Sequence, residues 1–340
     1  MNVTALICEL NPLHDGHKYI IDRARADADV LMLVMSGSFT ERGVPAVYDK
    51  YARAVSAVES GADLVFELPY PWCSAGVEGF ALGGVSIASS LGAGRLVFGS
   101  ESGDGELIER IARIKSSPEY KRNTLAAENT DRSAGTAEVF DKVLASFGVT
   151  EPLGANDKLG AEYVRYGREA GISSFTSVKR IDAKSASEIR KTMPESAAVE
   201  RRYNGILFDF CRISGDRSAN ELVRYAAKVA HDYADADGFI AALPTKKYTL
   251  ARLRREILAE ILNSNANPTD KPDFTVMLGA NEKGREYLAS VRKNAPIEIV
   301  TKPADAKSAQ VAVSSRADEL YCLCAGLCGG EMMRKKPFIL

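Results

Sequence analysis

The chain has three histidines, and two of them, His14 and His17, stand three positions apart close to its start. A histidine ring can donate a hydrogen bond to a phosphate oxygen, and it can carry positive charge where a leaving group gains negative charge. Gly16 lies beside His17 and would let the backbone come close to a bound molecule. These residue types at this spacing predict a site for phosphate chemistry.

The sequence on either side of the two histidines supports that prediction. They belong to the segment Asn11-Pro12-Leu13-His14-Asp15-Gly16-His17, which follows an apolar run at residues 3–8 and precedes an amphipathic run at residues 18–25. We interpret the first run as a strand and the second as a helix. The free N–H groups and the dipole of a helix N-terminus attract phosphate. Both histidines are therefore assigned a catalytic role.

The same histidines could instead cap the turn or bind a metal ion. A capping role does not explain why two of only three histidines occur at one strand-to-helix turn. A zinc site needs a third ligand and usually a catalytic carboxylate on the same helix, and the neighbouring sequence offers neither. We therefore predict no metal-binding residues.

Polar and glycine-containing segments follow the later predicted strands. The carboxyl ends of parallel strands meet at one edge of a sheet, where ligands bind. Gly99 would let an adenine or a ribose lie against the backbone, Asn156 offers an amide for polar edges, and Arg180 adds a cation. The segments expected at this edge are Ser36-Gly37-Ser38-Phe39, Glu41-Arg42-Gly43, Lys50 with Arg53, Phe98-Gly99-Ser100-Glu101, Gly154-Ala155-Asn156-Asp157 and Lys179-Arg180.

One more helix start is predicted at Ser185-Ala186-Ser187-Glu188-Ile189-Arg190. Ser185 is placed to cap the helix, and Arg190 lies one turn further on. Such a helix end suits a triphosphate. The pattern resembles the Ile-Ser-Ser-Thr-x-Ile-Arg signature of pantetheine-phosphate and nicotinate-mononucleotide adenylyltransferases. We assign Arg190 a catalytic role and Ser187 a role in binding ATP.

These segments need a scaffold that brings the strand ends together. In the first half of the chain, short apolar runs alternate with amphipathic runs, which predicts βαβ units and a parallel sheet with helices on both faces. The predicted strands lie at residues 3–8, 30–35, 64–67, 95–99 and 173–179, and helices are predicted at 18–25, 50–60, 79–91, within 100–135, and at 185–191.

The pattern changes after Pro194. Residues 195–263 are predicted to form mostly amphipathic helices, followed by a strand at 275–280, a helix at 282–293 and a strand at 297–301. The predicted fold class is therefore α/β. A parallel-sheet, Rossmann-like domain is expected at residues 1–195, and a mainly helical domain with a small β-α-β element at residues 196–340.

Composition narrows the class of protein. The chain has 340 residues, of which 46% are hydrophobic and 26% charged, with a net charge of -1, so it can bury a core and has no overall basic charge. No apolar run reaches the roughly 20 residues of a membrane span, and Glu9 interrupts the first run too early for a signal peptide. We expect a cytoplasmic protein with no membrane partner and with reduced cysteines. Cys322, Cys324 and Cys328 lack zinc-ribbon spacing and are expected to pack in a core.

The densest basic stretch lies in the second half of the chain. It contains Lys246, Lys247, Arg252 and Arg255, with Tyr248 among them. Cations on one side of a helix could neutralise phosphates, and a tyrosine could stack on a base. The alternative is a solvated helix face with leucines packed beneath it. We predict that the four basic residues contact RNA. The second basic cluster, Arg334-Lys335-Lys336, is expected to be a loose tail.

Taken together, motifs from nearly the whole chain resemble one family. They are Glu9-x-Asn11-Pro12-x-His14-x-Gly16-His17, Met35-Ser36-Gly37, Arg42-Gly43-x-Pro45-Ala46, Gly61-Ala62-Asp63-Leu64-Val65-x-Glu67-Leu68-Pro69, Phe98-Gly99-Ser100-Glu101, Lys247-Tyr248-Thr249-x-Ala251-Arg252-Leu253-x-Arg255 and Asn281-Glu282-Lys283-Gly284-Arg285-Glu286. The family is the tRNA(Met) cytidine acetate ligases, which belong to the nucleotidyltransferase superfamily with an H-x-G-H motif.

The resemblance implies a reaction in two steps. ATP and acetate would give acetyl-adenylate and pyrophosphate, and the acetyl group would then pass to the exocyclic amine of the wobble cytidine of elongator tRNA(Met). His14 and His17 would stabilise the departing pyrophosphate, and Mg²⁺ is expected on the triphosphate. The residues implied to bind ATP are Ile7, Cys8, Glu9, Leu10, Asn11, Pro12, Leu13, His14, Asp15, Gly16, His17, Lys18, Tyr19, Ile20, Gly99, Asn156 and Arg180.

The chain departs from the family at three places. Glu41 stands where a glutamine is commoner, Gly154-Ala155 replaces a usual Ser-Pro before Asn156, and the stretch between Arg180 and Ser185 is very short. Two other functions stay open. One is a small-molecule adenylyltransferase, which would need neither the basic stretch nor a long second half. The other is a non-catalytic nucleotide-binding or RNA-binding module. The sequence does not indicate an oligomeric state.

Overall fold

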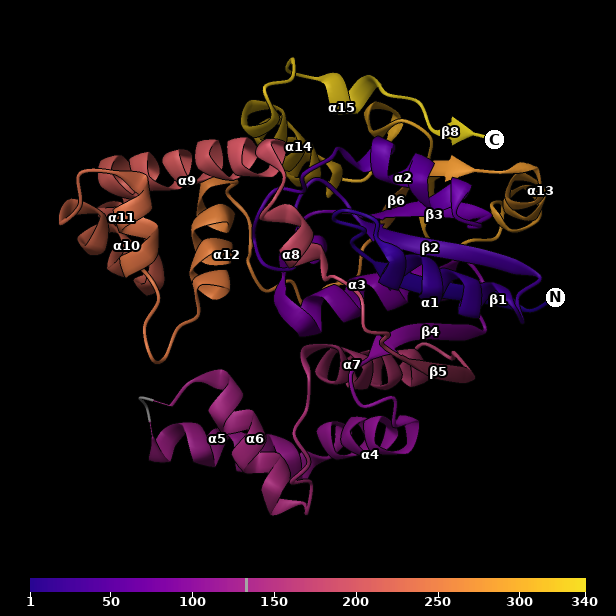
Figure 1. Ribbon diagram of the computed structural model, residues 1–340, viewed down its shortest axis with the longest axis horizontal. Coiled ribbons are helices and arrows are strands. Elements are labelled where there is room, and N and C mark those ends of the chain that lie inside the picture. Colours follow the sequence, from indigo (N-terminus) through magenta and orange to yellow (C-terminus); the bar gives the residue numbers. More distant parts are fainter. Residues whose placement is uncertain (132–133) are drawn as a thin grey trace.

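The computed structural model of the chain describes residues 1–131 and 134–340. At its centre is a twisted sheet in which the described strands are ordered β5-β4-β1-β2-β3-β6-β7, with β8 also pairing β6 (Figure 1). The first five strands run parallel to one another. They are β1 (Val3–Cys8), β2 (Val30–Ser36), β3 (Leu64–Leu68), β4 (Arg95–Ser100) and β5 (Ser174–Lys179). The prediction of a parallel α/β sheet is confirmed.

The inner strands are apolar because helices cover both faces of the sheet. Every residue of β2 and β3 is buried. Parallel strands are joined by right-handed crossovers, so the helices after β1 and β2 lie on one face and those after β3 and β4 on the other. The covering helices are α1 (Asp15–Arg25), α2 (Lys50–Glu59), α3 (Gly76–Ser90) and α7 (Ala155–Glu169). The last two pack against each other.

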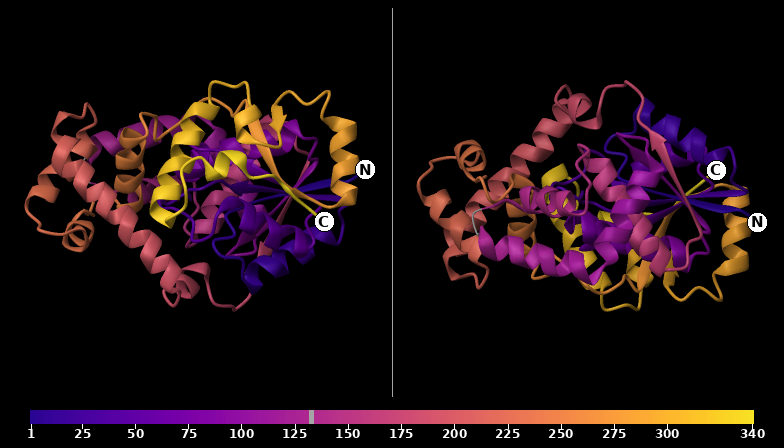
Figure 2. Two further views of the ribbon diagram at one scale, coloured as in Figure 1. Left: turned by 90° about the horizontal axis from the view of Figure 1, so that it is seen from above. Right: turned by 90° about the horizontal axis from the view of Figure 1, so that it is seen from below.

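Two groups of helices extend from this core. An insertion between β4 and α7 contains α4 (Gly105–Ser116), α5 (Pro118–Thr130) and α6 (Thr136–Ser146). A larger group follows β5 and occupies the end of the molecule opposite both chain termini (Figures 1 and 2). It contains α8 (Ala186–Arg190), α9 (Pro194–Ser214), α10 (Glu221–His231), α11 (Ala236–Ala242) and α12 (Leu250–Ile261). The helices predicted within 195–263 are present, and so is helical structure within 100–131; residues 132–133 of that predicted range lie outside the described residues.

The predicted β-α-β element is also present, but its place in the fold was not predicted. It consists of β6 (Phe274–Ala280), α13 (Glu282–Val291) and β7 (Glu298–Val300). β6 pairs antiparallel with β3, so the element continues the sheet of the first half. The pairing is supported by the Thr275 hydroxyl, which donates to the Glu67 carbonyl at 2.7 Å. Hydrophobic periodicity identifies a buried strand but not its partner. The division at residue 195 stays a prediction.

The C-terminal segment packs on the same side as α2. It contains α14 (Val311–Ala325), α15 (Glu331–Arg334) and β8 (Phe338–Ile339), which pairs β6. The expected loose tail is therefore an ordered end in which Lys335 donates to Asp49 at 3.1 Å. Cys322 and Cys324 are buried in α14 as expected, whereas Cys328 is exposed, and all six cysteines are free. Within the described residues, no helix is long and apolar enough to cross a membrane.

A buried ionic cluster joins α2 to this segment. Lys50 Nζ lies 2.7 Å from Glu67 Oε1 and 2.7 Å from Asp318 Oδ2, and all three side chains are almost inaccessible to solvent. Burial alone would lower the pKa of Lys50, but the charges of Asp318 and Glu67 raise it. The expectation that Lys50 faces the ligand edge is therefore wrong, since carboxylates from β3 and α14 occupy its ammonium group.

Candidate functional site

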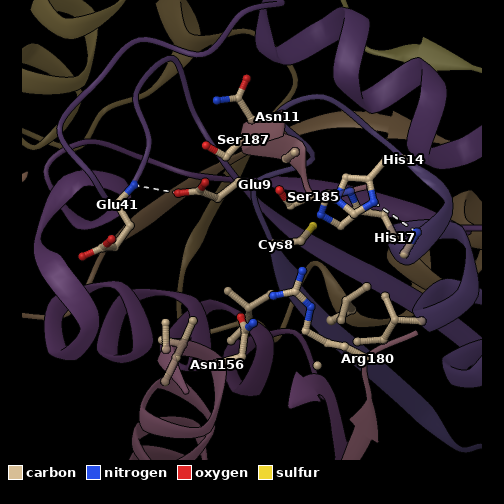
Figure 3. Close-up of a pocket in the computed structure, with 18 of the residues that line it drawn as sticks. Cys8, Glu9, Asn11, His14, His17, Glu41, Asn156, Arg180, Ser185 and Ser187 are labelled. Atoms are coloured by element: carbon tan, nitrogen blue, oxygen red, sulfur yellow. Dashed lines mark hydrogen bonds between the residues drawn. The ribbon is translucent and has the colours of Figure 1, made fainter. Parts of the chain in front are cut away.

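A cavity of about 390 Å³ opens at the carboxyl ends of β1, β4 and β5, beside the start of α1 (Figure 3). This is the sheet edge at which the strand-end segments were predicted to meet. Side chains from β1, α1, α7, α8 and the loop after β2 line it. The predicted site residues that line it are Ile7, Cys8, Glu9, Asn11, His14, Gly16, His17, Tyr19, Ile20, Gly99, Asn156, Arg180, Ser187 and Arg190.

The turn between β1 and α1 is held from several directions. Leu10 has a left-handed backbone with φ of +49° and is fully buried, which turns the chain sharply after the strand. Asn11 is buried, and its Oδ1 accepts a hydrogen bond from the backbone N–H of Val47 at 2.9 Å. Arg190 Nη1 donates to the Asn11 carbonyl at 2.5 Å. These contacts fix where the following histidines begin.

His14 is the N-cap of α1, and its Nδ1 accepts a hydrogen bond from the Gly16 N–H at 3.0 Å. In that tautomer Nε2 carries the proton and is free to donate. The rings of His14 and His17 lie with centroids 3.9 Å apart. A Cβ atom at Gly16 would approach the His14 ring to 2.9 Å. Glycine is therefore needed for this arrangement of the two rings.

The surroundings of both histidines lower their pKa and so favour the neutral rings. Burial lowers the pKa of His14, and Arg180 lowers it further. Burial lowers the pKa of His17 to about 3, with added effects from His14 and Arg180. A bound triphosphate would bring negative charge to this place and oppose the lowering. The pair is thus suited to meet an anion as hydrogen-bond donors and to gain positive charge with it.

The opposite wall is organised by Glu101, which follows β4. Its carboxylate accepts hydrogen bonds from the backbone N–H of Asn156 at 2.9 Å and from the Asn156 side-chain amide at 2.7 Å. Arg180 Nη1 lies 3.5 Å from it. Asn156 Oδ1 receives no hydrogen bond from a described residue and remains an acceptor, which suits an amino group such as that of adenine. The segment that contains Glu101 was expected at this edge, but its role in holding Asn156 was not predicted. The rule that the ends of parallel strands meet at one edge could have indicated this contact.

Comparison with known proteins places this site in a family. The sequence matches the HIGH Nucleotidyl Transferase family over residues 1–205 and 217–332. It is 30% identical to the tRNA(Met) cytidine acetate ligase of Lactobacillus delbrueckii subsp. bulgaricus, covering 94% of this chain and 95% of that protein. It is 31% identical to the one of Clostridium perfringens, covering 91% of each chain. The chain belongs to the tRNA(Met) cytidine acetate ligase family.

Solved structures agree with this assignment. Crystal structures of Thermotoga maritima TmcAL match the whole of this chain, and the whole of theirs is covered, at 26% identity. The one bound with alpha-thio ATP has a TM-score of 0.86, and the apo form has 0.84. The Rossmann-like fold class predicted for this ligase-family chain is confirmed.

Some residues predicted to bind ATP do not line the cavity. Leu10 packs in the core. Asp15 and Lys18 are exposed on the outer side of α1, where Lys18 Nζ lies 3.7 Å from Asp15 Oδ1. Pro12 and Leu13 lie in the turn before the helix, outside the cavity wall. The resemblance to the ligase family assigned one continuous segment to ATP binding. A helix presents only some of its residues to one side, so only part of that segment can face the cavity. The ATP contacts of the remaining predicted residues stay a prediction.

Arg53 also points away from the cavity. It is buried, and its guanidinium donates to the carbonyls of Glu9 at 2.7 Å and of Ser36 at 3.0 Å, as well as to that of Gly37. It thereby ties the end of β1 to the end of β2. The expectation that Arg53 offers its charge to a ligand is wrong, because backbone carbonyls at the strand ends occupy its donors.

The four basic residues predicted to contact RNA lie in two different surroundings. Lys246 is exposed, and Lys247 and Arg252 lie 5.3 and 5.2 Å from the centre of the Tyr248 ring. Arg255 is turned inward and donates to the Glu41 carbonyl and carboxylate, both at 3.1 Å. One side of α12 packs on the loop that contains Glu41, so Arg255 lies apart from the other three, and its contact with RNA stays a prediction. The other three stay candidates.

Proposed function

We propose that this chain is an ATP-dependent ligase that joins acetate to the wobble cytidine of elongator tRNA(Met). The observation that carries the proposal is the position of His14 and His17 at the start of α1, in one cavity with Asn156, Arg180 and Arg190. Phosphate-binding and adenosine-binding groups thus converge on one space. The names of its relatives support acetate and tRNA(Met) as the other substrates.

In the first step, acetate attacks the α-phosphorus of ATP, and the bond from that phosphorus to pyrophosphate breaks. The adenosine lies against Gly99 and Asn156, and the triphosphate lies over the start of α1. His14 and His17 donate to the phosphate oxygens and offset the charge that pyrophosphate gains on leaving. Arg190 keeps one guanidinium nitrogen on the Asn11 carbonyl and has the rest for phosphate. The products of this step are acetyl-adenylate and pyrophosphate.

In the second step, the acetyl group passes to the exocyclic amine of the cytidine, and AMP leaves. A tRNA is large and anionic, so it needs cations outside the cavity. Lys246, Lys247 and Arg252, with the Tyr248 ring between them, form the surface that we propose for it. The sheet half would thus handle ATP and the helical half tRNA. A tRNA substrate also implies that the protein works in the cytoplasm.

Magnesium enters this proposal only as part of the ATP substrate. Among the described residues, no group of three or more histidine, cysteine, aspartate or glutamate side chains is placed to hold a metal ion. Magnesium on nucleotides is bound chiefly by phosphate oxygens and water. Magnesium on the triphosphate would therefore need at most one or two carboxylates from the protein.

The test is acetate-dependent exchange of labelled pyrophosphate into ATP, followed by transfer of labelled acetate to tRNA(Met). We expect exchange with acetate and label on the tRNA. Exchange that requires a mononucleotide or phosphopantetheine in place of acetate would favour a small-molecule adenylyltransferase. ATP binding without exchange under any condition would leave a non-catalytic module and overturn the proposal.

A further inference from the structure

The cavity has two chemically different sides. The imidazole rings of His14 and His17 lie on one side, and the carboxylates of Glu9 and Glu41 lie on the other, with Arg180 on the wall between them (Figure 3). Phosphates are repelled by carboxylates, so the triphosphate belongs on the first side. The acidic side is left for the substrate that approaches with hydrogen-bond donors.

Glu9 is held in place by its surroundings. Its Oε1 accepts a hydrogen bond from the backbone N–H of Glu41 at 2.7 Å, and its carbonyl accepts from Arg53 at 2.7 Å. Its Oε2 receives no hydrogen bond from a described residue. Glu41 differs, because its carboxylate is engaged by Arg255. Glu9 therefore presents a fixed and unused carboxylate oxygen to the cavity.

A second polar group without a hydrogen-bond partner lies near Glu9. The hydroxyl of Tyr163 on α7 is buried and has no hydrogen-bond partner among the described residues. Burial raises the pKa of Tyr163 well above its ordinary value, and the charges of Cys8, Glu9 and Glu41 add to the rise. Buried polar groups are rarely left unpaired in proteins. An unpaired buried hydroxyl near Glu9 adds a second polar group beside the free carboxylate oxygen.

Resting on the ligase function proposed above, we propose that Glu9 accepts a hydrogen bond from the exocyclic amine of cytidine and takes its proton during acetyl transfer. Cytosine carries its amine as a donor, and a glutamate is a usual acceptor for it. Sequence resemblance grouped Glu9 with the ATP-binding segment. The geometry instead assigns it to the acyl acceptor.

The proton balance of the step explains why a base is needed. The lone pair of the amine nitrogen attacks the carbonyl carbon of acetyl-adenylate, and the bond from that carbon to the phosphate oxygen breaks with its electron pair leaving on AMP. The nitrogen then has one proton too many, which moves to Glu9 Oε2 and later to solvent. An amine conjugated with a ring is a weak nucleophile, so removing the proton as the bond forms speeds the step.

The charge around Glu9 supports this role. Burial raises the pKa of Glu9, and the charge of Glu41 adds to the rise, while the Glu41 N–H, Arg190 and Arg53 oppose it. Cys8 and Tyr163 are the other titratable groups beside it. Only the ionised carboxylate accepts a proton, so the transfer rate should rise with pH through the raised pKa of Glu9.

The test compares the two half-reactions in the variant Glu9→Gln. Glutamine keeps the oxygen that accepts from the Glu41 N–H but cannot take a proton. We expect acetate-dependent pyrophosphate exchange within about threefold of the parent protein and acetyl transfer to tRNA slower by about 10²-fold or more. The rise of the transfer rate with pH should disappear with it. The control is Glu59→Gln at the exposed end of α2, which should keep both activities.

Three results would overturn the inference. Equal loss of exchange and transfer in Glu9→Gln would mean that Glu9 serves ATP or the fold. Transfer at the parent rate, or a transfer rate that keeps its rise with pH, would mean that Glu9 takes no proton. Absence of acetate-dependent exchange in the parent protein would be a different failure, because it removes the ligase function on which the inference rests.

Discussion

The starts of α1 and α2 both come after a strand in the sequence, but they differ in the folded chain. Each follows a buried parallel strand, and each carries groups that bind anions: His14 and His17 at α1, and Lys50 and Arg53 at α2. At α1 these groups face an open cavity. At α2 they are buried and paired, Lys50 with Glu67 and Asp318. A strand-to-helix turn thus offers a binding site only where nothing else in the fold has covered it.

The helix that covers the start of α2 comes from far along the chain. Asp318 lies in α14, and Ser38 Oγ donates to its Oδ1 at 2.5 Å, so the loop after β2 is also tied to that helix. His14 and His17 instead line the cavity, and among the described residues no carboxylate pairs with either ring. Long-range packing, which local sequence does not record, therefore decided which of these side chains are buried and paired and which face the cavity.

The largest expected effect is on stability, at α2. Lys50→Met should lower the free energy of unfolding by about 3–5 kcal/mol, because it leaves the buried carboxylates of Glu67 and Asp318 unpaired. Lys158→Met is the control, since its ion pair with Asp141, whose side chain is 61% exposed, should contribute about 1 kcal/mol or less. Urea unfolding followed by circular dichroism measures both. Equal loss in the two variants would show that the buried cluster does not stabilise the fold.

The matching change at α1 should affect catalysis and spare stability. His17→Ala should slow acetate-dependent pyrophosphate exchange by about 10²–10³-fold, as expected when a donor to a developing anion is removed. His231→Ala is the control, because His231 is exposed on α10, where it pairs with Asp216. The binding of tRNA should not change in either variant. Unfolding of His17→Ala under the assay conditions would show that both helix starts are structural.

A third helix start sharpens the comparison, because the cations at the start of α12 are exposed or half-buried beside the start of α6. Changing Lys246, Lys247 and Arg252 to alanine should weaken tRNA binding. It should also reduce the slope of log affinity against log salt by about 0.7–0.9 for each phosphate that the protein no longer neutralises. Pyrophosphate exchange should stay at the parent rate. Filter binding over a series of salt concentrations measures the slope. A slope that does not change would place the tRNA surface elsewhere.

The last prediction concerns the titration of His17 and the pH dependence of stability that follows from it. Because its pKa is lowered to about 3 in the folded chain, His17 should stay neutral down to that pH, whereas in the unfolded chain it takes up a proton near its ordinary value of about 6.5. Stability should therefore fall as pH drops from about 6.5 toward 3, by at most about 1.4 kcal/mol per unit. Proton NMR of the ring checks the titration directly, and adding ATP should move it upward. Titration of His17 near its ordinary pKa without ATP would contradict the burial described above.

The sequence predicted what local patterns encode. The parallel strands, the helices that follow them, and the position of His14 and His17 at a helix start all follow from periodicity and turn chemistry. The inward direction of Arg255 could not be predicted, since it depends on the loop at Glu41 packing on α12. The pairing of β6 with β3 could not be predicted either, because the sequence of a fully buried strand does not indicate which strand lies beside it.

The pairing of β3 with β6, and of Lys50 with Asp318, has a consequence for synthesis on the ribosome. A ribosome that adds about 5–20 residues per second makes Asp318 roughly 10–50 s after it makes Glu67. Until then β3 has an open edge that can pair with other chains. Lys50 and Glu67 also lack Asp318, the third member of their ionic cluster. A nascent chain that already contains His14 and His17 therefore cannot complete this part of the core until Asp318 has been made.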